Sequence, residues 1–245
     1  MRKEFETKFK ILNTNLLSFE RDYKDVNNFY KYIQIGTRIK NKEQLIKECN
    51  KFVDENQQLT PDLGGVLCVL GYNDKNLRQD WFDLVDKFLD KDSDNPHYVR
   101  WQISLSYLAG KISNNKSYYT KCLNYDFRKF NTLILTKQLL SCIELAKMNT
   151  NKDEIKNILN KGLNLYKKGL SCDMNKIIGV NDCWLYFGCA EIAELSDIAS
   201  QLVIFYENID LFLKDKESFE KKLDWKRFGL LNYCRSLEEK LNSNG

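Results

Sequence analysis

The chain of 245 residues has little of three residue types on which many enzymes and β-rich folds depend. It contains one histidine, His97, two prolines and eleven glycines. A protein of this size that used imidazoles for acid–base chemistry, or to hold a catalytic metal, would usually carry several histidines. Few prolines and glycines favour long helices over short strands joined by tight turns. This composition therefore predicts a helical protein without imidazole chemistry.

The sequence motifs of common catalytic and cofactor sites are also missing. The sequence has no glycine-rich phosphate loop, no serine nucleophile elbow, and no pair of cysteines with the two-residue gap of zinc and redox sites. No apolar run reaches the roughly 18 residues that a membrane-spanning helix needs. We therefore expect no enzymatic activity, no cofactor, no bound metal and no membrane span.

The eight cysteines do not form a recognisable disulfide or metal pattern. Most lie among apolar residues, as Cys68 does between Leu67 and Val69, and a reduced cysteine in such a place packs as a small hydrophobic residue. Cys183, beside Trp184, is interpreted as core for the same reason. Because the chain opens on a charged amphipathic segment and not on a signal peptide, we expect a reducing, cytoplasmic compartment.

Apolar residues recur at steps of three and four along nearly the whole sequence, which is typical of amphipathic helices. Two clear helix starts are Thr60-Pro61 and Asn95-Pro96, where a capping side chain precedes a proline. The two prolines are 35 residues apart, close to the 34-residue spacing of tetratricopeptide repeats. The small and aromatic residues of that repeat do not follow. The pattern predicts an all-α fold of about ten antiparallel helices in a bundle or a short tetratricopeptide-like solenoid.

The expected helices are joined by short polar linkers. They include the ranges 76–91, 96–110, 129–148, 152–170, 197–213 and 216–241. A short buried helix over Leu63–Tyr72 contains Gly64 and Gly65, which would allow a neighbouring helix to approach closely, and Ile177–Ala193 is expected to be a second buried helix. The polar segment 111–117 is predicted to be a loop. The chain is thus expected to be one helical domain over 1–245, or two lobes with a boundary near 111–117.

The net charge of +4 is distributed in alternating blocks. Residues 1–51 carry a net charge of +5, 52–100 carry −5, 101–180 carry +8 and 181–245 carry −4. If the blocks stay separate in the fold, their field would guide a charged partner. The simpler alternative is that the blocks mix in space.

Aspartates at steps of three and four mark the best candidate site. The residues proposed for partner binding are Asp80, Asp83, Asp86, Asp90 and Asp94, with Asp92 between the last two. Such a series lies along one side of a helix. Three interpretations are open: an ordinary solvated face, a surface that binds a basic protein, and a site for a divalent ion or an acid–base pair.

Three other features have a functional and a structural interpretation. Between Lys116 and Lys137, aromatic residues alternate with basic ones, which suits nucleic-acid binding but also any helix with one buried side. The pI of about 8.5 is below the usual value for nucleic-acid binding. His97 is interpreted as a partly exposed residue at a helix start, although it could serve as a catalytic histidine if the fold brought a nucleophile or carboxylate to it. Trp225 is either an interface anchor or a core residue.

The sequence thus favours a non-enzymatic protein whose partner is another protein. The most specific hypothesis is a cytoplasmic immunity protein that occludes the active site of a cognate, basic toxin. Alternatives are a nucleic-acid-binding helical protein that uses the basic 101–180 block, a structural or scaffold subunit, and a metal-dependent helical hydrolase. The identity of the partner, the binding surface and the oligomeric state stay open.

Overall fold

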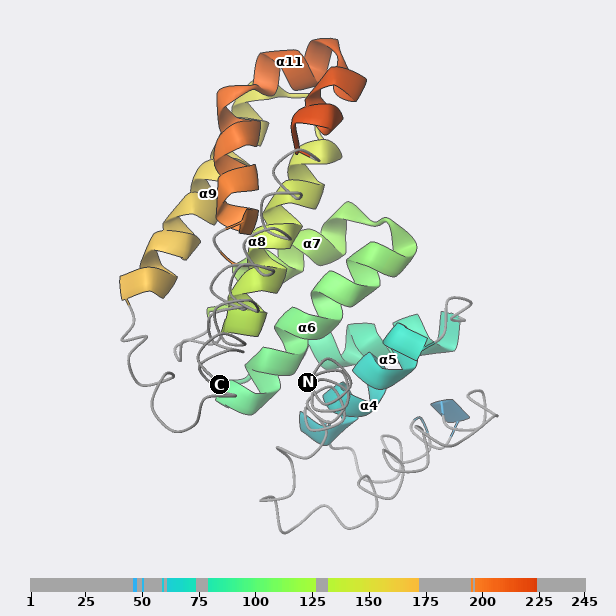
Figure 1. The fold of residues 1–245 in the computed structure, drawn as a ribbon. Coiled ribbons are helices and arrows are strands. Elements are labelled where there is room, and N and C mark those ends of the chain that lie inside the picture. Colours follow the sequence, from blue (N-terminus) through green and yellow to red (C-terminus); the bar gives the residue numbers. More distant parts are fainter. Residues whose placement is uncertain are drawn as a thin grey trace, which may run out of the picture. The chain divides into compact units, whose positions relative to one another are not determined.

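The computed structural model describes residues 46–47, 50, 59, 61–73, 79–126, 132–171, 195 and 197–223. These residues form helices and the turns between them, and no strand is among them (Figure 1). The prediction of an all-α fold is therefore confirmed. No helix in this part of the chain is both long enough and apolar enough to cross a membrane. The chain divides into two compact units, unit 1 over Met1–Asn114 and unit 2 over Asn115–Gly245, and each is described separately.

Unit 1 contains three well-described helices: α4 (Pro61–Asn73), α5 (Gln79–Leu89) and α6 (Pro96–Ser113). Helix α6 packs against both α4 and α5. Gly64 lies where α4 meets α6, and a Cβ atom at this position would be 2.6 Å from the Cβ of Trp101. The predicted close approach at Gly64 is therefore confirmed.

Helix α6 begins where the sequence predicts. The Asn95 side chain accepts a hydrogen bond of 2.9 Å from the backbone N–H of His97, and Pro96 is the first helical residue. The cap satisfies one of the amides that have no partner within the helix, and proline at this position loses no hydrogen bond.

The end of α6 differs from the prediction, because the helix continues to Ser113. The prediction of a loop over 111–117 is therefore wrong. The connection consists of Asn114, in the left-handed conformation with φ 53°, and Asn115, which caps α7 (Lys116–Asn124). Ser113 donates its hydroxyl hydrogen bond to the Ala109 carbonyl at 2.7 Å. The polar residues of this segment are thus the outer side of a continuing helix.

Unit 2 contains α7, α8 (Thr132–Lys147), α9 (Lys152–Ser171), a helix over 197–207, α11 (Ile209–Lys214) and a helix over 216–223. Helix α8 packs against α7 and α9, and α9 contacts α11. Three aromatic rings join the last helices, with centroid distances of 4.6 Å for Phe205–Phe219, 4.7 Å for Phe205–Phe212 and 5.3 Å for Phe212–Phe219.

The predicted single helix over 197–213 is wrong, because the chain turns at Asn208. The Ile204 carbonyl accepts both the backbone N–H of Asn208 at 3.1 Å and the Asn208 side-chain amide at 2.8 Å, so the side chain adds a second donor at the end of the first helix. The buried helix expected over Ile177–Ala193, Cys183, Trp225 and the end of the helix expected over 216–241 lie outside the described residues.

Candidate functional site: the acidic face of helix α5

The inner side of α5 is fixed by apolar contacts within unit 1. Its buried residues are Trp81, Leu84, Val85, Phe88 and Leu89. The Trp81 indole is fully buried, and its Nε1–H donates a hydrogen bond of 3.0 Å to the Leu67 carbonyl of α4. Rotation of α5 about its axis would expose these side chains, so the packing also fixes which residues face outward.

The C-terminal end of α5 is held by two side chains of α6. The Tyr98 ring stacks on Phe88 with a centroid distance of 4.1 Å, and the Tyr98 hydroxyl donates to the Phe88 carbonyl at 3.0 Å. The buried Gln102 amide donates to the carbonyls of Phe88, Leu89 and Lys91 at 3.3, 3.2 and 2.7 Å. These carbonyls have no donor within α5, so Gln102 acts as a cap contributed by another helix.

The outer side of α5 carries the predicted aspartates. Asp83 is exposed and Asp86 half-buried on the side of α5 opposite the buried residues, and the half-buried Asp80 lies at the edge of that side. Asp90, which is exposed, directly follows the last residue of the helix. Asp92 and Asp94 are exposed in the connection that follows. Residues 79–95 hold six aspartates and two lysines, a net charge of −4. We call Asp80, Asp83, Asp86, Asp90 and Asp94 the acidic face.

Neighbouring side chains hold parts of this face in position. Gln79 donates its amide to an Asp83 carboxylate oxygen at 2.9 Å, and Asp80 accepts the Trp81 backbone N–H at 3.0 Å. Lys91 donates to the Leu59 carbonyl at 2.9 Å and lies 5.1 Å from the centroid of the Tyr98 ring. The ammonium of Lys91 is therefore directed toward the body of unit 1.

The carboxylates of this face do not converge on a point. Among the residues that the structure describes, no three histidine, cysteine, aspartate or glutamate side chains come together in a group that could hold a metal ion. His97 is exposed in the first turn of α6, as predicted.

The basic and aromatic segment in unit 2 is only partly on the surface. Tyr118 and Tyr119 are buried in the core, so the core interpretation of these two rings is confirmed. Lys116 is exposed and Lys121 half-buried. Phe127, Arg128, Lys129 and Phe130 lie outside the described residues. Two of the aromatic rings that would stack on bases are therefore occupied by packing.

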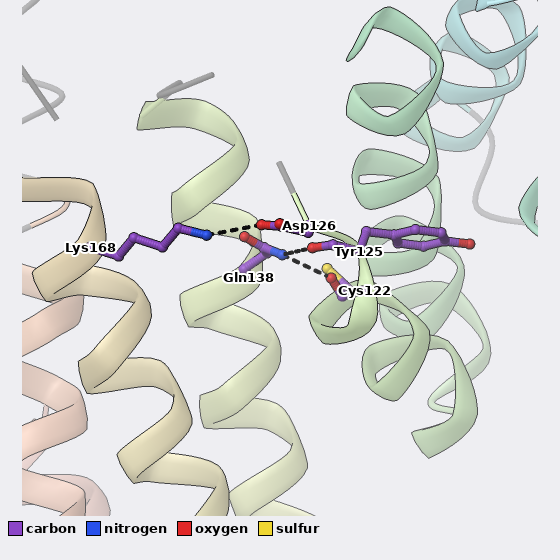
Figure 2. A network of polar contacts seen from close by, with 5 residues as sticks. All are labelled: Cys122, Tyr125, Asp126, Gln138 and Lys168. Atoms are coloured by element: carbon purple, nitrogen blue, oxygen red, sulfur yellow. Dashed lines mark hydrogen bonds and ion pairs between the residues drawn. The ribbon is translucent and has the colours of Figure 1, made fainter. Parts of the chain in front are cut away.

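A second polar network, which the sequence analysis missed, surrounds the end of α7 (Figure 2). The buried Gln138 of α8 donates its amide to the carbonyls of Cys122 and Tyr125 at 3.1 and 3.0 Å. From α9, Lys168 pairs with the Asp126 carboxylate at 2.9 Å, and Lys161 donates to the Asn124 side chain at 3.2 Å. Two lysines of the basic block are thus engaged with other helices of unit 2.

The sequence blocks of opposite charge also meet within unit 2. Lys152, from the basic 101–180 block, forms an ion pair with Asp210, from the acidic 181–245 block. The hydrogen bond and the positive charge of Lys152 hold the pKa of Asp210 below its ordinary value. At this place the blocks mix in space, which is the simpler of the two expectations.

The described cysteines are packing residues. Cys68, Cys122 and Cys142 are free and buried. Burial and, to a smaller extent, Cys122 raise the pKa of the Cys142 thiol to about 12, although Lys161 opposes the shift. A thiol that stays protonated at neutral pH is a poor nucleophile, so Cys142 is not suited to covalent chemistry.

Comparison with known proteins does not assign the chain to a family. No protein-family model matches the sequence. Neither the curated proteins nor the solved structures contain a significant match to it. The function is therefore inferred from the residues and their geometry.

Proposed function

We propose that this chain is a non-enzymatic, cytoplasmic binding protein whose partner is another protein with a basic surface. The proposed contact is the acidic face of α5 and of the connection that follows it. The proposed specific role is that of an immunity protein, which covers the active site of a cognate toxin and so neutralises it. Steric occlusion of this kind needs no reactive group in the protein that occludes.

The observation on which this proposal rests is that α5 has apolar, buried residues on one side and carboxylates on the other. The buried residues Trp81 and Phe88 anchor its inner side, so the carboxylates on its outer side keep their positions before a partner arrives. Preorganised groups lose little freedom on binding. A net charge of −4 over residues 79–95 would speed the encounter with a basic partner and select against acidic ones.

Binding of nucleic acid through the basic 101–180 block is the alternative that the contacts favour less. Tyr118 and Tyr119 belong to the core, while Lys161 and Lys168 hold the end of α7. A structural or scaffold role is a further alternative, which stable oligomers in solution without an outside partner would indicate.

Charge reversal on the acidic face tests the proposal. The tagged chain captures proteins from a lysate of its own source, and the captured protein is identified, purified and used for kinetics. The variant D83K/D86K is compared with the control E207K/E220K. Both double substitutions change the net charge by the same amount, but Glu207 and Glu220 lie in unit 2. Circular dichroism confirms that both variants fold.

We expect the association rate constant of D83K/D86K to fall about tenfold or more at low salt, with a smaller difference at high salt. The control variant should associate like the wild type. If the partner is a toxin, co-expression of the wild-type chain should restore growth and D83K/D86K should restore less. Equal rates for both variants would remove the acidic face from the interface. A salt-dependent gel shift of RNA or DNA by the wild type, without a protein partner, would favour the nucleic-acid alternative.

A further inference from the structure

Two helix pairs, α5–α6 in unit 1 and α7–α8 in unit 2, share the same buried polar contact. Gln102 is the seventh residue of α6 and Gln138 the seventh residue of α8. Each is buried, and the amide of each donates to two carbonyls that are three residues apart at the end of the preceding helix. These shared acceptors are Phe88 and Lys91 for Gln102, and Cys122 and Tyr125 for Gln138; Gln102 also donates to the Leu89 carbonyl, which has no counterpart in the second pair.

The buried positions of the two pairs follow the same register. The residues Leu84, Val85, Phe88 and Leu89 of α5 are buried, as are Tyr118, Tyr119, Cys122 and Leu123 of α7. The second set follows the first by 34 residues, and the acceptor carbonyls have the same offset. The second helices begin 36 residues apart, at Pro96 and Thr132, so the distance along the chain from the buried set to the second helix is two residues longer in the second pair.

We infer that α5–α6 and α7–α8 are two copies of one helix-pair unit. Its common elements are four buried positions on the first helix and a glutamine that closes the end of that helix. Carbonyls in the last turn have no donor within their helix, and buried carbonyls need one. A glutamine in the next helix meets this requirement in both copies, with the same two acceptor positions.

The outer side of the first helix is the part that differs between the copies. Asp83, Asp86 and Asp90 correspond to the neutral residues Ser117, Thr120 and Asn124 at the same offset of 34. The unit therefore folds without carboxylates at these positions, and the acidic face is a property of the first copy alone. Only this last consequence, that one copy carries the partner contact, rests on the proposed function.

Native-state hydrogen exchange tests the equivalence of the two glutamines. In Q102A, amides in the last turn of α5 should lose protection by about ten- to hundredfold, because the carbonyls of Leu89 and Lys91 lose their glutamine donor while Phe88 keeps that of Tyr98. In Q138A the same loss should occur in the last turn of α7, where the carbonyls of Cys122 and Tyr125 lose theirs. Q79A, which alters an exposed glutamine of α5, should change protection by less than about threefold. A large loss in one variant and none in the other, or a loss spread evenly over both units, would overturn the inference.

A graft tests the same inference without disturbing the core. D83S/D86T/D90N gives α5 the outer residues of α7, and we expect it to keep the helical circular dichroism of the wild type and an equal or higher melting temperature, because like charges at helical spacing are removed. A graft that fails to fold would show that the positions are not equivalent. A folded graft that still binds the partner would contradict the proposed function, but it would not contradict the inference that the two helix pairs are copies of one unit.

Discussion

The first helices of the two pairs, α5 and α7, share four buried positions and a glutamine contact but differ in the additional contacts that hold them. Helix α5 is anchored by a buried indole and by the stack of Phe88 on Tyr98. The end of α7 is braced by Lys161 and Lys168 of α9. Apolar contacts do not depend on ionic strength, whereas exposed ion pairs are screened by salt. The comparison predicts that the two units respond differently to mutation, salt and pH.

Removal of the indole should have the largest effect. Trp81→Ala leaves a cavity on the inner side of α5 and should lower the free energy of unfolding by about 3–5 kcal/mol, as measured by urea denaturation. Trp81→Phe keeps most of the apolar contact and loses the hydrogen bond to Leu67, so it should cost less. A loss below about 1 kcal/mol in Trp81→Ala would contradict an apolar anchor of α5.

Loss of the ion pair between Lys168 and Asp126 should have a smaller effect on stability, and this effect should depend on salt. Lys168→Met removes the pair with Asp126 and should lower the free energy of unfolding by about 0.2–1 kcal/mol at low ionic strength. At a salt concentration of about 1 M, the difference in the free energy of unfolding between the variant and the wild type should vanish. Lys167→Met, which removes an exposed lysine next in the sequence, is the control. A loss that persists at high salt would show that the lysine stem, and not its charge, holds α7.

The carboxylate of Asp215, at the start of the helix over 216–223, extends the comparison to the pH dependence of stability. Hydrogen bonds from the Ser218 side chain and backbone hold the pKa of Asp215 below its ordinary value of 3.8. The ionised group is therefore favoured in the folded state, and its contribution to stability is present above pH 3.8 and lost as the pH falls through the lowered pKa. The caps Asn95 and Asn115 in α6 and α7 do not titrate.

Asp215→Asn should keep the cap and remove its titration. The urea midpoint of the wild type should fall more steeply than that of the variant as the pH is lowered through the lowered pKa of Asp215, and the two should be parallel near neutral pH. Curves that stay parallel throughout the acid range would show that this cap does not contribute to the pH dependence of stability.

Features that depend on neighbours in the sequence could be predicted. The cap at Asn95 and the proline after it define the start of α6, because both act within one turn. The outward position of Asp83 and Asp90 follows from the helical period once Trp81 and Phe88 are assigned to the core. Likewise, Gly64 between apolar residues indicates a close helix contact.

Features that depend on another helix could not be predicted. A glutamine within a helix is usually a solvent-facing residue, and nothing next to Gln102 or Gln138 shows that each reaches carbonyls 11 to 16 residues earlier in the chain. The polar residues of 111–117 suggest a loop, but a helix with one exposed side tolerates the same composition. The apolar residues on both sides of Gln102 and after Gln138, in Trp-Gln-Ile and Gln-Leu-Leu, are the local indication that the glutamines are buried.

The missing side chain at Gly64 has a consequence for how the sequence of this protein can change over evolution. The nearest atom of its neighbour is the Cβ of Trp101, which is bonded directly to the backbone of α6 and cannot rotate away. At Gly71 the closest atom is the terminal methyl of Leu108, which a rotamer change can displace. A Cβ at position 71 would also lie 2.9 Å from the Trp81 ring. Descendants of this chain can therefore vary position 71 only by moving the side chains of Leu108 and Trp81, whereas any variation at position 64 requires the backbone of α6 to shift.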